Sequence, residues 1–350
     1  MSYELNKKIC ELKPYEPISG TYKIRLDANE CPVSYPPEVM AQVREAVDKV
    51  LYNRYPDPMA TEVTDAFAKY YGISSELVTA GNGSDELIFL IESAFLEKGD
   101  KMLVVSPDFS MYQFYSSICE VECDSFIKDD SLNINIDSLI KKINDDNIKL
   151  VIFSNPCNPT GKGVLREDAR RLVKSVNALV ILDEAYMDFW DQSLIDEVEE
   201  YSNLIVFRTA SKAIGSAALR LGFAVANKTI SNAIKAVKSP YNVNSISQVI
   251  GSVIYKNKEY LINRQNTIVN NRKKLYNNLL SIANLCDDFK VFDSCANFFF
   301  VITSFGKELW DYLKDNSIVI RYMGDYIRIT VGTEEENNEL INCIKKYISR

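Results

Sequence analysis

The middle of the chain alternates short apolar, β-branched runs with segments of helical periodicity. Continuous apolar runs are typical of strands buried on both faces, because a half-exposed strand would alternate apolar and polar residues. Helical connections between such strands predict an α/β fold with helices covering a mostly parallel sheet. The expected strands are Met102–Ser106, Leu150–Ser154, Leu179–Leu182, Leu204–Phe207 and Leu221–Ala226, and Arg166–Val176 is an expected helix.

The rest of the chain predicts more helices and a second, smaller unit. A single core stops growing at about 250–300 residues, and this chain has 350. Helical spacing recurs over 37–51 and 61–71, and strand-like segments near the C-terminus precede a final helix opened by Thr333 and Glu336 as a capping box. We expect a large domain over 40–245, and a small α+β domain formed by 1–39 together with 246–350.

The absence of histidine excludes several kinds of active site. Ser-His-Asp hydrolysis, Cys-His proteolysis and His-based zinc hydrolysis all need an imidazole. The eight cysteines include no Cys-x-x-Cys pair, and the first residues show no signal-peptide pattern, so we expect reduced thiols, no metal site and a cytoplasmic location. A net charge of −8 and short apolar runs argue against nucleic-acid or membrane partners.

A glycine-rich turn, Gly81-Asn82-Gly83-Ser84-Asp85-Glu86, precedes an apolar helix over 87–96. Free N–H groups at a helix start attract anions such as phosphate. Plain helix capping by Ser84 or Asp85 explains the turn equally well. The turn matches neither the dinucleotide fingerprint nor a Walker loop.

Three further motifs follow the expected strands, at the edge where open α/β sheets bind ligands. Two Asn-Pro steps in Asn155-Pro156-Cys157-Asn158-Pro159-Thr160-Gly161 make a rigid turn that holds a carboxamide. Asp183 ends a buried strand, where a carboxylate either caps the next helix or needs a cationic partner. Ser211-Lys212 follows the next strand. A lone lysine there would be an ordinary surface charge, but an amine, phosphate ligands and an acidic partner together are what pyridoxal phosphate requires.

These motifs resemble the signature set of the fold-type I pyridoxal-phosphate aminotransferases and, within it, the histidinol-phosphate aminotransferase branch. The matching segments span nearly the whole chain in the family's order: Leu26–Glu30, Asn53–Pro56, Asn155–Gly161, Asp183–Tyr186, Ser211–Gly215, Arg220–Gly222, Pro240–Asn244 and Arg328–Gly332. The resemblance implies an aspartate aminotransferase-like fold with a seven-stranded type of large sheet. It also implies transamination of small amino and keto acids in histidine biosynthesis, with glutamate as donor, by a homodimer with shared active sites.

The resemblance assigns five residues to the cofactor ring. Lys212 would hold the cofactor as a Schiff base and move the proton of the α-carbon. Asp183 would keep the ring nitrogen protonated, and Asn155 and Tyr186 would hydrogen-bond the ring hydroxylate. Phe109 would stack on the ring, although core packing explains this residue as well.

The cofactor phosphate would be bound by the backbone N–H groups of Ser84 and Asp85, by Ser211 and Arg220, and by Tyr55 of a neighbouring subunit. The sequence departs from the family pattern at Cys157, where Asn is usual, and at Asp27 and 216–218.

Three residues are expected to bind the substrate. Arg328 would clamp a carboxylate, and a hairpin would bring Arg321 to the same mouth to bind a second anionic group. Tyr15 resembles the tyrosine that closes over substrate phosphate in this branch. An aromatic or broad-specificity aminotransferase, a threonine-phosphate decarboxylase and a non-catalytic pyridoxal-phosphate sensor remain alternatives.

Overall fold

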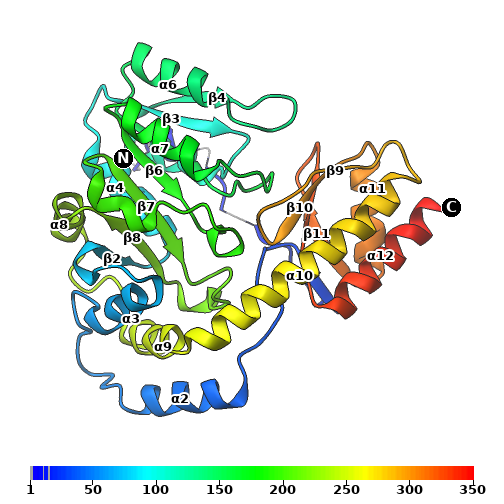
Figure 1. Cartoon of the computed structure of the whole chain (residues 1–350), viewed down its shortest axis with the longest axis horizontal. Coiled ribbons are helices and arrows are strands. Elements are labelled where there is room, and N and C mark those ends of the chain that lie inside the picture. Colours follow the sequence, from blue (N-terminus) through cyan, green and yellow to red (C-terminus); the bar gives the residue numbers. More distant parts are fainter. Residues whose placement is uncertain (1–2, 11, 15) are drawn as a thin grey trace.

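The computed structural model describes residues 3–10, 12–14 and 16–350, and these residues are arranged around two β-sheets (Figure 1). Tyr15, which was expected to bind substrate phosphate, lies outside the described residues. The larger sheet has the strand order β2-β8-β7-β6-β5-β3-β4, and the smaller has the order β1-β11-β12-β10-β9. The two sheets and their helices form two lobes joined through α10 (Lys258–Ala283) and the N-terminal segment.

The larger sheet confirms the predicted parallel core. Its strands are β2 (Val78–Gly81), β3 (Lys101–Ser106), β4 (Glu122–Ile127), β5 (Leu150–Ser154), β6 (Leu179–Asp183), β7 (Leu204–Thr209) and β8 (Gly222–Ala226). Strands β4, β3, β5, β6 and β7 pair in parallel, and β8 is antiparallel to both of its neighbours. The loops after β5, β6 and β7 therefore leave the sheet at the same edge.

Helices cover both faces of this sheet. One face packs against α3 (Thr61–Tyr71), α6 (Ile136–Asp145), α7 (Arg166–Ser175) and α9 (Ser245–Lys256). The other face packs against α4 (Ser84–Phe95), α5 (Met111–Cys119) and α8 (Lys228–Val237). Helix α2 (Pro37–Asp48) lies against α9, and the 3-10 turns are η1 (Ser75–Leu77), η2 (Met187–Phe189), η3 (Ile195–Glu200) and η4 (Ala217–Leu219). Burial on both faces is the physical reason for the continuous apolar runs in β5, β6 and β7.

The smaller sheet combines the two ends of the chain. Its strands are β1 (Ile24–Leu26), β9 (Lys290–Val291), β10 (Phe298–Ile302), β11 (Ile318–Tyr322) and β12 (Ile327–Thr330). Strand β1 pairs in parallel with β11, whereas β11, β12, β10 and β9 are antiparallel. Helices α10, α11 (Gly306–Asp315) and α12 (Glu334–Ile348) accompany this sheet, and the capping box of Thr333 and Glu336 opens α12 as predicted.

The N-terminal segment contacts both lobes. Strand β1 joins the smaller sheet, whereas α1 (Lys7–Cys10) lies beside α5, where Lys8 pairs with Glu120. The domain limits at residues 39 and 245 stay a prediction. Within the described part of the chain, no helix is long and apolar enough to cross a membrane.

Candidate active site

The predicted motifs meet at the edge of the larger sheet. Ser154 at the end of β5 is paired with Asp183 at the end of β6, and Asp183 is paired with Phe207 of β7. Because the strands are parallel and in register, the loops that carry Asn155, Tyr186 and Lys212 start side by side.

Asp183 is a buried carboxylate that only neutral donors hold. Tyr112 Oη donates to Oδ2 at 2.8 Å, and the Ala185 N–H donates to Oδ1 at 3.1 Å. Burial raises the pKa of Asp183 to about 6. Among the ion pairs of the described residues, none involves this carboxylate. A cationic group in contact with it would relieve the cost of its burial, so the site fits a protonated pyridine nitrogen.

Lys212 and Tyr186 lie together beside the segment that follows β1. Lys212 Nζ lies 5.7 Å from the centre of the Tyr186 ring and donates to the Ala28 carbonyl at 2.9 Å. Tyr186 Oη accepts from Asn29 Nδ2 at 3.0 Å. Asn29 was part of a matching motif but had no predicted role.

Three consecutive carbonyls of this segment serve residues from both lobes. The Asp27 carbonyl accepts from Arg328 Nη2 at 2.9 Å, and the Asn29 carbonyl accepts from Asn297 Nδ2 at 3.1 Å. The Ala28 carbonyl, which lies between them in the sequence, accepts a hydrogen bond from Lys212 of the other lobe. The backbone bends at Asp27 and Ala28, and Asn29 has a positive φ of 55°, so the three carbonyls point in different directions.

The N-terminus of α4 forms a cradle that suits an anion. Gly83 precedes the helix with a positive φ of 85°. A Cβ on Gly222 would lie 2.6 Å from the Ser84 nitrogen, so β8 approaches the helix start as closely as a glycine permits. Arg220 Nη2 lies 3.3 Å from the Asp85 carboxylate. Helix N–H groups beside a guanidinium fit a phosphate group.

Ser211 lies next to this cradle through β7. Thr209 Oγ1 donates to Ser211 Oγ at 3.0 Å, and Thr209 is paired with Gly222 across the sheet. The structure thus brings Ser84, Arg220 and Ser211 to one corner.

The two asparagines of the proline-rich loop face different partners. Asn155 Oδ1 accepts from the Val164 N–H at 2.8 Å, and its Nδ2 donates to the Val164 carbonyl at 3.1 Å. This leaves one amide hydrogen of Asn155 for another acceptor. Asn158, which had no predicted role, accepts from Arg328 Nη1 through Oδ1.

Arg328 is buried at the mouth of the site, opposite Arg321. The two residues are directly paired across the antiparallel strands β12 and β11, as the expected hairpin requires. Burial, reinforced by the like charge of Arg321, lowers the pKa of Arg328. Two guanidiniums on one face of the sheet fit a substrate with an anionic group.

Two aromatic residues predicted for the site differ in their surroundings. Phe109 is half-buried and meets Tyr112, the partner of Asp183, edge to face at 5.5 Å. Tyr55 is 80% exposed and stacks on Tyr241 at 4.5 Å. Tyr112 had no role predicted from the sequence, although it lies in the same segment as Phe109.

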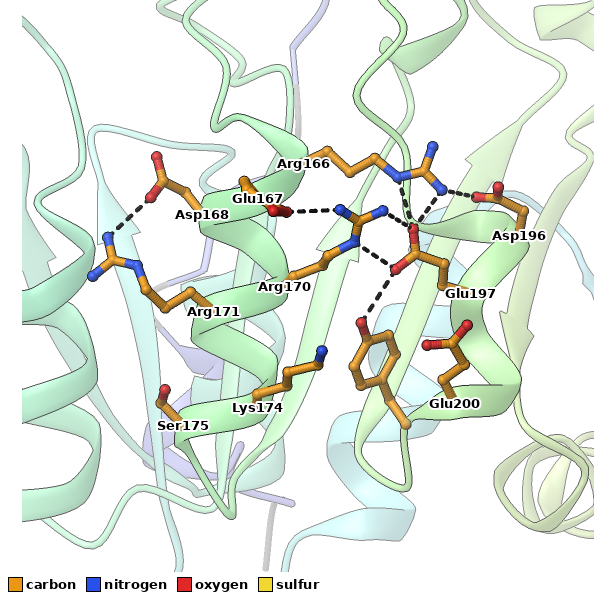
Figure 2. A pocket seen from close by; sticks show the side chains of 11 residues that line it. Arg166, Glu167, Asp168, Arg170, Arg171, Lys174, Ser175, Asp196, Glu197 and Glu200 are labelled. Carbon is orange, nitrogen blue, oxygen red and sulfur yellow. Dashed lines mark hydrogen bonds and ion pairs between the residues drawn. The ribbon is translucent and has the colours of Figure 1, made fainter.

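A separate cavity of about 810 Å³ lies between α7 and η3 (Figure 2). Glu197 lies at its centre and accepts hydrogen bonds from Arg166, Arg170 and Tyr201. Hydrogen bonds from Arg170 and Arg166, against the opposing effect of burial, lower the pKa of Glu197 to about 2. The lining includes no residue predicted for the active site, so we interpret this cluster as a structural ion-pair network.

Comparison with known proteins gives matches over nearly the whole chain. The model of the family "Aminotransferase class I and II" matches residues 21–344. Histidinol-phosphate aminotransferase of Clostridium novyi (strain NT) is 41% identical over 344 residues, which are 97% of this chain and 96% of that protein.

Solved structures share the fold. The histidinol-phosphate aminotransferase of Sinorhizobium meliloti, in complex with pyridoxal-5'-phosphate, superposes with a TM-score of 0.87 at 21% identity over 99% of this chain and 97% of that one. Aspartate aminotransferase of Thermus thermophilus superposes with a TM-score of 0.81 at 17% identity over 99% of this chain and 100% of that one.

Proposed function

This chain belongs to the class I and II aminotransferases, and on that basis we propose that it uses pyridoxal phosphate to transfer the amino group of glutamate to imidazole-acetol phosphate, a step of histidine biosynthesis. The observation that carries the proposal is the buried carboxylate of Asp183, which has no cationic partner among the described residues and lies at the sheet edge that also presents Lys212. The 41% identity to a histidinol-phosphate aminotransferase supports the choice of substrate.

When bound, pyridoxal phosphate supplies a protonated ring that withdraws electrons from the α-carbon of the substrate. The Asp183 carboxylate would hold the proton on the ring nitrogen. Lys212 Nζ is the amine that would attach to the cofactor and later carry the proton to and from the α-carbon. Tyr186 would hydrogen-bond the ring hydroxylate.

The cradle at α4 would bind the cofactor phosphate. The N–H groups of Ser84 and Asp85 are free at the first turn of the helix, as in any α-helix. Arg220 would turn from the Asp85 carboxylate to the phosphate, and Ser211 would add its hydroxyl. These contacts would hold the cofactor in place without taking part in proton transfer.

Arg328 and Arg321 would bind the anionic end of the substrate. Their direct pairing across β11 and β12 supports a substrate that carries a phosphate or a carboxylate. Because Asn155 is bonded twice to Val164, we further propose Asn158 as the carboxamide of this loop that acts beside the substrate.

A homodimer and a cytoplasmic location are parts of the same proposal. Tyr55 is exposed, although the family resemblance assigns it to a cofactor phosphate. In a two-fold assembly, a side chain that is exposed on its own subunit can enter the active site of the second subunit.

A substrate panel tests the proposed function. Purified protein with pyridoxal phosphate, and with 2-oxoglutarate as amino acceptor, is given histidinol phosphate, histidinol, phenylalanine and threonine phosphate. Both amino transfer and CO₂ release are measured. We expect histidinol phosphate to be by far the best amino donor, with no CO₂ release. Equal kcat/KM for histidinol phosphate and histidinol would indicate a broad-specificity aminotransferase, and CO₂ from threonine phosphate would indicate the decarboxylase.

A further inference from the structure

A buried pair of charges lies behind the substrate arginine. Lys128 directly follows β4, Asp108 lies in the loop between β3 and α5, and their side chains are 2% and 3% exposed. Lys128 Nζ lies 4.0 Å from the Asp108 carboxylate. It also donates to the Pro107 carbonyl at 2.7 Å and to Cys157 Sγ at 2.8 Å. No motif in the sequence assigned a role to either charge.

Hydrogen bonds connect this pair to Arg328 without interruption. The Asp108 carboxylate accepts from the Ser154 N–H at 3.1 Å and from the Ser154 hydroxyl. Ser154 Oγ in turn accepts from the Asn158 N–H at 2.9 Å, and Asn158 Oδ1 accepts from Arg328 Nη1. Each group in this series has its donor and acceptor in place, so the series links the Asp108 carboxylate to the Arg328 guanidinium.

The charges of the pair depend on one another. Burial raises the pKa of Asp108, and Lys128 opposes this effect. Burial also disfavours the charge of Lys128, but Cys157 and Asp108 outweigh it and raise the pKa of the ammonium. Without Lys128 the pKa of the buried Asp108 would rise further, which favours its protonated form. A protonated carboxyl is a donor as well as an acceptor, so it would no longer accept both bonds from Ser154 unchanged.

We propose that Lys128 and Asp108 are positioning residues that aim the Arg328 guanidinium through Ser154 and Asn158, and thereby set the affinity for the anionic group of the substrate. The inference rests on the proposed function, because it takes Arg328 as the ligand of that group. A guanidinium binds a carboxylate or phosphate through two parallel hydrogen bonds only when its plane is held in the correct orientation. Lys128 and Asp108 would act on the substrate through other residues, namely Ser154, Asn158 and Arg328.

The test separates binding from turnover. K128M is compared with the unmutated protein in KM and kcat for glutamate and in the inhibition constant of glutarate, an unreactive acid of the same length. We expect KM and the inhibition constant to rise about tenfold, the factor that corresponds to about 1.4 kcal/mol. We expect kcat to change by less than about threefold and the absorbance of the bound cofactor to stay the same. K101M is the matched control, because Lys101 pairs with Glu122 in an exposed position at the opposite ends of β3 and β4.

A double-mutant cycle identifies the route of the effect. If Lys128 acts through Asn158, K128M weakens glutarate binding in the unmutated protein but adds little in N158A. Independent effects in the two backgrounds would overturn the proposed route. Since K128M leaves a buried carboxylate without its cation, D108N/K128M provides a version without either charge, for which we expect the same loss of affinity.

Unchanged glutarate binding in folded D108N/K128M would refute the positioning role while the proposed function stands. A protein that neither transaminates nor binds glutarate before mutation would instead overturn the proposed function, and this inference with it.

Discussion

Arg321 and Arg328 are directly opposite each other across the antiparallel strands β11 and β12. Like charges in this arrangement destabilise a sheet, because the side chains of opposed residues lie on the same face. An anion bound between the two guanidiniums removes this cost. The pair is therefore better suited to binding a ligand than to stabilising the protein alone.

Replacing Arg321 tests the contribution of this pair to substrate choice. In R321A we expect the preference for histidinol phosphate over histidinol to fall by about tenfold or more, since one charge-assisted hydrogen bond contributes about 1.5–3 kcal/mol. Activity on phenylalanine should be largely retained. Steady-state kinetics with the three donors measure the change, and R44A, an exposed arginine of α2, is the control. A preference that survives in R321A would place the phosphate elsewhere.

Lys212 is expected to be indispensable. K212A should bind pyridoxal phosphate without a covalent bond, so that borohydride treatment adds no cofactor mass, and transamination should fall by several powers of ten. Mass spectrometry and absorbance spectra provide the measurements. K238A, which removes a lysine at the C-terminus of α8, should retain the covalent adduct. An active K212A enzyme is incompatible with the proposed mechanism.

Asp183 should make the cofactor-free protein less stable as the pH rises. Its pKa of about 6 in the folded state exceeds the value of about 3.9 in an unfolded chain. The folded state therefore holds a proton more tightly, and stability is lost as the pH rises from about 4 to above 6. D183N removes this loss, so its cofactor-free form should have a higher Tm than the unmutated protein at pH 8 and a similar Tm at pH 4. Its affinity for pyridoxal phosphate should fall. A lower Tm of D183N at pH 8 would contradict the expected linkage.

Glu197 should show the opposite dependence. The pKa of Glu197 is about 2 in the folded state, below the value of about 4.3 in an unfolded chain. The ionised carboxylate therefore contributes fully to stability above about pH 4.3, and this contribution is lost as the pH falls toward about 2. We expect E197Q to lose on the order of 2 kcal/mol of unfolding free energy at pH 7, and less at pH 3. Urea unfolding at both pH values measures the difference. E167Q, which changes an exposed partner of Arg170, should cost no more than about 1 kcal/mol.

Complementation tests the shared active site. Y55A and K212A chains are each expected to be nearly inactive, but a hybrid dimer of the two has one site with both native residues. Mixing the chains, unfolding them and refolding them should restore activity. Two Y55A chains refolded alone serve as the control. If the mixture stays inactive, Tyr55 acts within its own chain, and full activity of Y55A alone would show that Tyr55 has no role.

The sequence was sufficient for the elements in which burial determines the pattern. Strands β5, β6 and β7 are buried on both faces, and their apolar runs identified them directly. Two strands of the larger sheet were not recognised. β4 lies at the edge of the sheet and is mostly half-buried, so its sequence ECDSFI has no continuous apolar run, and β2 is only four residues long.

The positions of Asp183 and Lys212 at the sheet edge were predictable, because Asp183 ends β6 and Lys212 closely follows β7. The role of a residue was less predictable where it depends on contacts with residues distant in the sequence. Asn155 and Asn158 both precede a proline, and only the contacts with Val164 and Arg328 distinguish them. The pairing of Tyr112 with Asp183 joins positions 71 residues apart, and local sequence carries no signal for such a contact.

The segment after β1 contacts Arg328, Lys212 and Asn297 through backbone oxygens. Substitutions at positions 27–29 therefore leave these acceptors in the chain, whatever side chains replace the present ones. Inserting or deleting one residue there would shift all of them by one step and exchange the lobe that each carbonyl faces. In an evolving population the exposed position 28 should thus accept substitutions far more readily than the stretch accepts a change of length, whereas Asn29 is also held by its side chain on Tyr186.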